Sequence, residues 1–274
     1  VPTHIFNKIC PELQHKGFTK SKTPIRVQLL GQHPQWMAEN AVKAVALGSH
    51  GIDINFGCPA KTVNKSKGGA VLLKSPEEIY QIVAAVKQAV PKGTIVSAKI
   101  RLGFENSNLL NEIVDAVVAA NAEQLTIHAR TKSDGYRPPA YWHLIGEMSK
   151  KHEIELFANG EIWTKANAIQ CMQEAHTQNL MLGRGALAMP NLANIIKHNQ
   201  NPMSWLALCD LIKKFALLEL NGDKSFYFSS RVKQWLRYLK LMFTEADTLF
   251  NNIKTLKSKQ DIITIINNLN SHNN

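Results

Sequence analysis

The sequence predicts an α/β fold in which parallel strands alternate with helices, followed by an all-helical part. Three observations support this fold class. Six short apolar runs alternate with segments of helical periodicity between residues 25 and 182. The connections between these segments are short, which favours parallel strands joined by right-handed crossovers. From about Pro190 onward no further strand is predicted, and the apolar residues recur at helical spacing.

Each predicted strand is an apolar run that ends in glycine or in a polar turn. The predicted strands occupy residues 25–30, 51–56, 95–101, 124–128, 155–158 and 179–182. Helices are predicted around them over residues 5–13, 34–47, 76–90, 109–120, 142–151 and 164–174, with a basic loop over 61–69. Beyond residue 196, a small helical bundle is predicted from helices over 204–220, 228–243, 245–255 and 260–269.

Composition narrows the class of protein. The chain has 274 residues, of which 45% are hydrophobic, so it can bury a large core and a smaller second one. It holds no apolar run of 18 residues, so no membrane span is expected. Its four cysteines match no zinc-binding spacing and indicate free thiols in a reducing cytoplasm, without a metal. The net charge of +11 indicates a polyanionic partner, and the lack of a basic amphipathic anchor favours nucleic acid over a membrane.

The segment 52–61 carries the most informative residues. Its apolar residues alternate with polar ones as on a strand, and Gly57 and Pro59 then end the strand. Cys58 is therefore expected at a carboxyl end of the sheet, where a reactive side chain can face a ligand. The alternative is a buried cysteine that acts only as a small hydrophobe.

Polar side chains collect at the carboxyl end of every predicted strand. In a (β/α) barrel, this rim is where binding and catalytic sites are built. A lysine inside a strand, such as Lys99, is costly to bury unless it contacts a ligand. These rim residues therefore predict a site, and they are Gln28, Asn55, Cys58, Lys99, Arg101, His128, Arg130, Asn159 and Arg184.

Glycine-containing turns follow the last two predicted strands, Asn159-Gly160-Glu161 and Gly183-Arg184-Gly185. A glycine before a helix lets backbone N–H groups approach a phosphate, and an arginine adds charged donors. The alternative is that both turns only end their strands in a left-handed conformation. A phosphate-bearing flavin held there would bring its ring toward Lys99 and Gln28, with His128 nearby. The Cys58 thiol would face the same cavity as a general acid, as a nucleophile or as neither.

The predicted helix over 228–243 places cations beside aromatic residues, in the string Arg231-Val232-Lys233-Gln234-Trp235-Leu236-Arg237-Tyr238. One interpretation is a face that binds RNA phosphates and stacks on bases. The other is an ordinary amphipathic helix, with Trp235 and Leu236 packed inward and the cations in solvent.

Several strings together resemble the tRNA-dihydrouridine synthase family over nearly the whole chain. They are Asp53-Ile54-Asn55-Phe56-Gly57-Cys58-Pro59, Lys99-Ile100-Arg101-Leu102-Gly103, Ile127-His128-Ala129-Arg130-Thr131, Ala158-Asn159-Gly160-Glu161 and Gly183-Arg184-Gly185-Ala186. Two further strings resemble the C-type bacterial branch, which acts on the D-loop uridine at position 16. These are Pro59-Ala60-Lys61-Thr62-Val63-Asn64 and Lys233-Gln234-Trp235-Leu236.

The resemblance implies an FMN enzyme that uses NADPH to reduce a tRNA uridine to 5,6-dihydrouridine. In such an enzyme the flavin gives hydride to C6 of the uracil, and Cys58 is the implied proton donor to C5. The target base would be flipped into the barrel mouth, with Asn55 beside it. The implied flavin contacts are Gln28, Lys99, His128, Asn159, Gly160, Glu161, Gly183 and Arg184. The implied substrate and tRNA contacts are Asn55, Arg101, Tyr136, Arg231, Lys233, Arg237 and Tyr238.

The chain departs from the family at its beginning. The family's barrel has eight strands, whereas six are predicted here, and the Met-Ala-Pro-x-x-Gly string of the family's first strand is absent. The expected fold is thus a (β/α)8 TIM-type barrel lacking its first two strands, incomplete at the N-terminus. Its expected parts are an FMN-binding barrel over 1–195 and a helical tRNA-binding domain over 196–274. Because the barrel could not close and its flanking strands would have open edges, we expect this chain to bind FMN weakly or not at all. A monomer is expected.

Two other functions stay open. An FMN barrel that reduces or oxidises a small pyrimidine, such as a dihydroorotate-type or dihydropyrimidine-type dehydrogenase, would share Lys99 and the phosphate site. It would not explain the basic helical part. A non-catalytic tRNA-binding remnant would fit the missing strands. Replacing Cys58 by alanine separates these functions, because only the tRNA-modifying enzyme would lose dihydrouridine formation while retaining tRNA binding.

Overall fold

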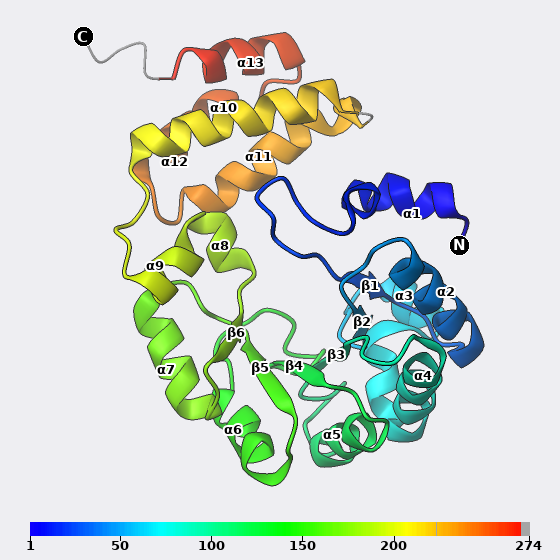
Figure 1. Cartoon of the computed structure of the whole chain (residues 1–274). Helices are drawn as coiled ribbons and strands as arrows, with labels where there is room; N and C mark the ends of the chain where they lie inside the picture. Colours follow the sequence, from blue (N-terminus) through cyan, green and yellow to red (C-terminus); the bar gives the residue numbers. More distant parts are fainter. Residues whose placement is uncertain (223, 270–274) are drawn as a thin grey trace. The chain divides into compact units, whose positions relative to one another are not determined.

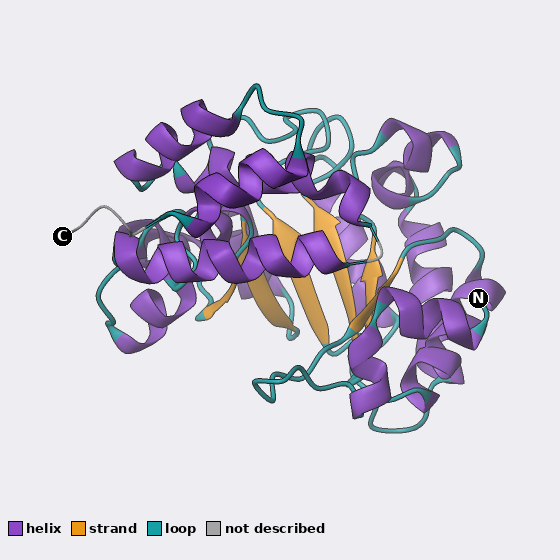
Figure 2. Cartoon of the chain, turned by 90° about the horizontal axis from the view of Figure 1, so that it is seen from above, coloured by secondary structure: helices purple, strands orange, loops and turns teal. Residues whose placement is uncertain are grey.

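The computed structural model describes residues 1–222 and 224–269 (Figure 1). Its six strands form one parallel sheet in the order β1-β2-β3-β4-β5-β6, with β1 and β6 at the two ends of that order. The strands are β1 (Val27–Leu29), β2 (Ile52–Asn55), β3 (Val96–Arg101), β4 (Gln124–His128), β5 (Glu155–Asn159) and β6 (Asn179–Met181). All six predicted strands are confirmed, with ends that differ from the prediction by at most two residues. Figure 2 shows them side by side in orange.

The register of the strands separates a polar face of the sheet from an apolar one. Side chains alternate between faces along each strand, so residues paired across the strands share a face. One polar row is Gln28, Asp53, Ser97 and Gln124, and the apolar row next to it is Leu29, Ile54, Ala98 and Leu125. The apolar row packs under helices, as expected for parallel strands joined by helical crossovers.

The helices that follow the strands supply this cover. α2 contacts β1 and β2, α4 contacts β3, and α6 contacts β5, while α5 packs against α4. Their bounds are α2 (Pro34–Ala46), α4 (Pro76–Ala89), α5 (Leu110–Ala119) and α6 (Trp142–Lys151), and α7 (Lys165–Ala175) follows β5. On α4, the side chains of Ile79, Ile82, Val83 and Val86 are fully buried. The helix is predicted from Pro76 at its first position and from Glu77 and Glu78 in its first turn, and the structure has all three there.

Two predicted segments differ from the structure. The helix expected over 5–13 is broken into α1 (Thr3–Ile9) and a 3-10 turn, η1 (Pro11–His15). The reason is Pro11, which cannot continue the helix and moves Cys10 out of helical conformation, to φ −133° and ψ 77°. The basic loop expected over 61–69 contains a short helix, α3 (Lys61–Lys65), and η2 (Gly69–Lys74) follows it.

The chain divides into two compact units. The first comprises residues 1–161 and 170–181, which include the whole sheet, and the second comprises residues 162–169 and 182–274. The division into a cofactor domain over 1–195 and a tRNA domain over 196–274 concerns function, and it stays a prediction. Two short helices of the second unit, α8 (Arg184–Ala188) and α9 (Leu192–His198), are absent from the predicted elements.

The second unit is largely a helical bundle with its own apolar core. Its longer helices are α10 (Trp205–Asn221), α11 (Phe228–Leu239), α12 (Thr244–Ile253) and α13 (Lys259–Asn267), with a 3-10 turn, η3 (Ser225–Tyr227), before α11. Ser204 and Ser258 cap the starts of α10 and α13 through their hydroxyl oxygens. The four predicted helices are confirmed, although α11 ends four residues early, where the chain turns before buried Phe243.

Within the described residues, no helix has the length and apolar character needed to cross a lipid bilayer.

Candidate active site

Cys58 lies in a tightly held turn directly after β2. The turn begins where the Gly57 N–H donates to Asn55 Oδ1 at 2.9 Å. The carbonyl of Cys58 then accepts from the Ala70 N–H and from Asn64 Nδ2, both at 3.0 Å. Cys58 itself is half-buried. The backbone around the thiol is therefore fixed from two sides, while the side chain retains access to its surroundings.

Gly69 is required for this turn. Its φ is +67°, in the left-handed region, and a Cβ there would lie 2.9 Å from the Cys58 carbonyl oxygen. The glycine lets η2 approach the Cys58 backbone closely.

A chain of hydrogen bonds connects the strand end near Cys58 to a buried carboxylate. Asn55 Nδ2 donates to Gln28 Oε1 at 2.8 Å, and Gln28 Nε2 donates to Asp53 Oδ2 at 2.5 Å. The Ser97 hydroxyl donates to the other oxygen of Asp53 at 2.7 Å. Asp53 thus fixes the orientation of both amides, so the sheet edge presents donors and acceptors in a defined order.

Lys99 places a half-buried cation on the same polar face, one strand away from Asn55. Its Nζ donates to Asn159 Oδ1 at 3.3 Å, and Asn159 Nδ2 donates to the Met181 carbonyl at 2.7 Å. Burial, together with the nearby Arg101 charge, lowers the pKa of Lys99 to about 8 against the opposing effect of Asp53. A cation held at this cost suits contact with an electron-rich ligand.

A cavity lies over the polar face of the sheet. Its volume is about 670 Å³, within the range usual for ligand sites. Gln28, Asp53, Thr126 and Met181 line it together with Ile25, Arg26 and Ile95 at the amino ends of the strands, whereas Asn55, Cys58 and Lys99 are not among its lining residues. The polar side chains of this row therefore face open space rather than a packed core.

Arg101 is fully buried, and its guanidinium is bonded to backbone carbonyls. Nε donates to the Gly57 carbonyl at 2.9 Å, and Nη1 donates to the carbonyls of Thr131 and Gly135 at 3.0 and 2.9 Å. The guanidinium also lies 5.3 Å from the ring centre of Tyr136, and burial lowers its pKa. This arrangement suits a residue that positions the Cys58 turn, whereas the predicted contact with tRNA would need an exposed side chain.

The ends of β4 and β5 form the other part of this edge. His128 is buried, with its ring 6.0 Å from that of Tyr136. Gly160 has a φ of +118°, and a Cβ there would lie 2.9 Å from His128 Cδ2, so glycine lets the His128 ring occupy this place. Glu161 forms an ion pair with buried Arg130. The structure thus brings Gln28, Asn55, Cys58, Lys99, Arg101, His128, Asn159, Gly160 and Glu161 to the carboxyl edge of one sheet.

Arg130 and Asp53 are structural partners of this edge whose roles sequence patterns did not reveal. Arg130 Nε donates to the Pro139 carbonyl at 3.1 Å, but its buried Nη1 has no hydrogen-bond partner among the described residues. Asp53 belongs to a strand in which apolar and polar residues alternate, and this pattern does not predict its hydrogen bonds with Gln28 and Ser97. The sequence places Arg130 among the polar residues at the strand ends, but it does not show that its guanidinium pairs with Glu161.

The remaining predicted cofactor residues belong to the second unit. Gly183 is exposed and directly precedes the five-residue helix α8. Arg184 is half-buried, and its guanidinium lies 5.2 Å from the ring centre of Trp163.

The predicted tRNA residues on α11 make contacts within the second unit. Arg231 donates to both carboxylate oxygens of Glu219 at 2.7 and 2.8 Å, and Lys233 Nζ donates to the Leu256 carbonyl at 2.5 Å. Arg237 is exposed and lies 5.8 Å from the Phe250 ring centre, while Tyr238 is half-buried. Of the four, Arg237 is therefore the most available to a polyanion.

Across residues 1–222 and 224–269, no three His, Cys, Asp or Glu side chains gather as metal ligands.

Comparison with known proteins assigns the family. The sequence profile described as dihydrouridine synthase (Dus) matches residues 2–270. A tRNA-dihydrouridine(16) synthase of Shewanella oneidensis is 49% identical over 274 residues, which is 100% of this chain and 87% of that protein. The proteins of the same name in Pasteurella multocida and Escherichia coli K12 are 51% and 48% identical, over 95% and 96% of this chain and 84% of each relative. The chain therefore belongs to the dihydrouridine synthase family of oxidoreductases.

Proposed function

We propose that this protein reduces the uridine at position 16 of tRNA to 5,6-dihydrouridine, with FMN as cofactor and NADPH as reductant. The names of its relatives support the reaction and the position. The observation that carries the proposal is the sheet edge itself, where Cys58 follows Asn55 and lies one strand from Lys99. We further propose that the enzyme acts as a monomer in the cytoplasm.

The residues of the sheet edge fit an FMN ring. A flavin needs a cation near its pyrimidine edge and an amide to hydrogen-bond that edge. Lys99 supplies a half-buried cation, and Gln28 supplies an amide held by Asp53. Buried Arg130 Nη1 adds a donor for which the described residues provide no acceptor. Within the first unit, the residues that we propose hold FMN are Gln28, Lys99, His128, Asn159, Gly160 and Glu161. Gly183 and Arg184 of the second unit stay predicted cofactor contacts.

The chain's own residues supply the remaining chemistry. Bound FMN, once reduced, supplies the hydride that reaches C6 of the uracil. The Cys58 thiol gives its proton to C5, so the C5=C6 double bond takes up one hydride and one proton. Asn55 holds the flipped base beside the thiol, and Arg101 holds the turn that carries the thiol.

The tRNA would be held by basic and aromatic side chains away from the reacting base. Tyr136 is 53% exposed and can stack on a nucleotide, while its ring stays over buried Arg101. On the second unit, we propose Arg237 and Tyr238 as the main contacts of α11, with Arg231 and Lys233 beside them. The net charge of +11 supports a polyanionic substrate.

Position-resolved mapping of dihydrouridine tests the proposal. Unmodified tRNA with uridine at position 16 is incubated with the protein, FMN and NADPH, and modified positions are located by mass spectrometry. We expect dihydrouridine at position 16 and none in a matched tRNA that has cytidine there. Absence of dihydrouridine from a preparation that has bound FMN, or its formation at another position only, would overturn the proposal.

A further inference from the structure

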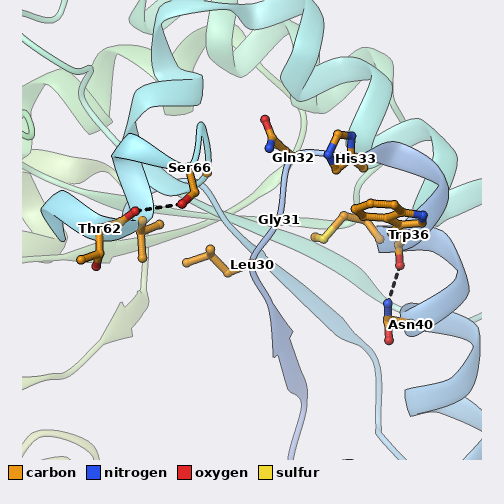
Figure 3. Close-up of a pocket in the computed structure, with 11 residues that line it drawn as sticks. Leu30, Gly31, Gln32, His33, Trp36, Asn40, Thr62 and Ser66 are labelled. Carbon is orange, nitrogen blue, oxygen red and sulfur yellow. Dashed lines mark hydrogen bonds between the residues drawn. The ribbon is translucent and has the colours of Figure 1, made fainter. Parts of the chain in front are cut away.

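A second cavity lies at the carboxyl end of β1, outside the set of residues assigned to the reaction. Its volume is about 530 Å³. The loop after β1 and the start of α2 form one wall, and α3 with Gly68 forms the other (Figure 3). We call it the Trp36 pocket, and the lining residues that matter here are Leu30, His33, Trp36, Thr62 and Ser66.

The walls of the Trp36 pocket suit a flat aromatic ligand. Trp36 is 63% exposed, although burying such a ring is normally favourable. The His33 ring packs against it edge to face, with ring centres 4.4 Å apart, so the indole is held in one orientation. Leu30 is 43% exposed at the same cavity. Thr62 on α3 and Ser66 directly after it add hydroxyl groups, which Figure 3 shows opposite the Trp36 side. The Ser66 hydroxyl donates to the Thr62 carbonyl at 3.1 Å, so toward a ligand it can still accept. A nucleobase has this combination of an aromatic face and a polar edge.

The charge beside the pocket suits a phosphate. The segment 61–67 contains Lys61, Lys65 and Lys67 and no acidic residue. Lys65 follows Thr62 by three residues on α3, so it lies on the same side of the helix as the pocket lining. Lys65 is exposed, and the α2 side contributes one acidic residue near the lining, Glu39. The local balance therefore favours a nucleotide over an uncharged aromatic compound.

The pocket and the Cys58 turn share one segment of chain. Asn64 Nδ2 on α3 donates to the Cys58 carbonyl at 3.0 Å. Gly68, which lines the pocket, directly precedes Gly69, whose backbone closely approaches that same carbonyl. An RNA strand with one base at Cys58 would thus find the Trp36 pocket within the reach of neighbouring nucleotides.

We propose that the Trp36 pocket binds a second unpaired nucleotide of the tRNA whose uridine is reduced, with the base on Trp36 and the phosphate at Lys65. The inference rests on the proposed function. It assigns to the β1–α2 loop and α3 a share of tRNA recognition that is separate from the chemistry at Cys58.

Equilibrium binding of unmodified tRNA by the full protein tests the pocket. Trp36→Ala should raise the Kd roughly 5- to 100-fold, the range given by loss of one base–aromatic stack. Trp36→Phe, which retains an aromatic ring, should recover most of the affinity. Tyr80→Ala is the matched control, since Tyr80 is an exposed aromatic residue on α4, and its Kd should stay at the wild-type value. Equal affinity of Trp36→Ala and wild type would overturn the proposal.

The salt dependence of the same binding tests the phosphate contact. Lys65→Gln should reduce the slope of log Kd against log salt by about 0.7–0.9, the change expected for one lost phosphate contact. Lys92→Gln should leave the slope unchanged, because Lys92 is exposed on the loop before β3, at the opposite edge of the sheet. An unchanged slope in Lys65→Gln would contradict the proposed contact between Lys65 and a phosphate of the tRNA.

Two further measurements separate the remaining alternatives. The first distinguishes a nucleotide of the tRNA from NADPH as the ligand of the Trp36 pocket. The second distinguishes failure of the proposed pocket from failure of the proposed reaction. NADPH-driven flavin reduction without tRNA should proceed at the wild-type rate in Trp36→Ala. Slower reduction with unchanged tRNA affinity would assign the pocket to the dinucleotide and contradict the proposal.

If wild type forms no dihydrouridine but Trp36→Ala still weakens tRNA binding, the proposed reaction fails and the pocket stands. If wild type forms dihydrouridine and Trp36→Ala binds tRNA normally, the pocket alone fails.

Discussion

Single residues on the polar face of the sheet act through the partners that orient them. Asp53 is buried, and it fixes Gln28, which in turn fixes Asn55. Removing the carboxylate would leave the Gln28 amide free to rotate by half a turn and exchange its donor and acceptor, while Asn55 would retain only its bond from the Gly57 N–H. The order of polar groups beside Cys58 therefore depends on a residue two positions before Asn55 on the same strand.

The pKa of Lys99 predicts how stability depends on pH, and this prediction can be tested without substrate. Its folded pKa of about 8 lies below the ordinary lysine value of 10.5, because burial disfavours the charged form. Between these pH values the unfolded chain holds a proton that the folded chain has released, so stability should rise with pH in this window. Lys99→Met should lose this rise, as measured by urea unfolding at pH 8, 9 and 10 without added flavin.

Lys92→Met is the control for the Lys99 prediction, because Lys92 is exposed and its removal should leave the wild-type pH dependence in place. Equal pH dependence of wild type and Lys99→Met would show that the ammonium is not strained by its burial, and would weaken the case for a ligand beside it.

At the scale of elements, Arg101 connects the turn after β2 to the loop over 131–135. Lysine cannot reproduce the planar set of donors that contacts three carbonyls. We expect Arg101→Lys to lower the free energy of unfolding by about 2–5 kcal/mol, since at least two buried carbonyls lose their donor. The rate of reduction should fall about 100-fold through misplacement of Cys58, while tRNA affinity stays within twofold.

Arg137→Lys is the matched control for Arg101, because Arg137 donates to the carbonyls of Ser133 and Asp134 in the same loop but at an exposed site, where water can replace its bonds, so neither quantity should change. Weaker tRNA binding by Arg101→Lys with unchanged stability would instead support the tRNA contact implied by family resemblance.

The elements differ in how well the sequence predicts them. Strands such as β3 are predicted because apolar residues alternate with polar ones and Gly103 then ends the pattern, which leaves few alternatives. The short helices α3, α8 and α9 are not, because five to seven residues carry little periodicity and depend on contacts made after folding. Likewise the polar rim is predicted from strand ends, whereas the burial of Arg101 depends on carbonyls about 30 residues away in the chain.

At the scale of the whole molecule, the residues proposed for the reaction and the tRNA contacts proposed on α11 lie in different parts of the chain. The sheet edge with Cys58 lies in the first compact unit, and the basic helix α11 lies in the second. The net charge of +11 is not concentrated on α11, where Arg231 and Lys233 are already engaged within the protein. We therefore expect the net charge of the whole molecule to produce the long-range electrostatic attraction for tRNA. The proposed reaction depends instead on a few side chains at the sheet edge.

The most direct test of this account is dihydrouridine formation by Cys58→Ala, with tRNA affinity measured on the same preparation. The account predicts that reduction falls about 10²- to 10⁴-fold, the usual contribution of a positioned general acid, while the Kd for tRNA stays within twofold of wild type. Reduction at the wild-type rate would contradict the role of the thiol, and loss of tRNA binding together with activity would contradict its assignment to the chemical step.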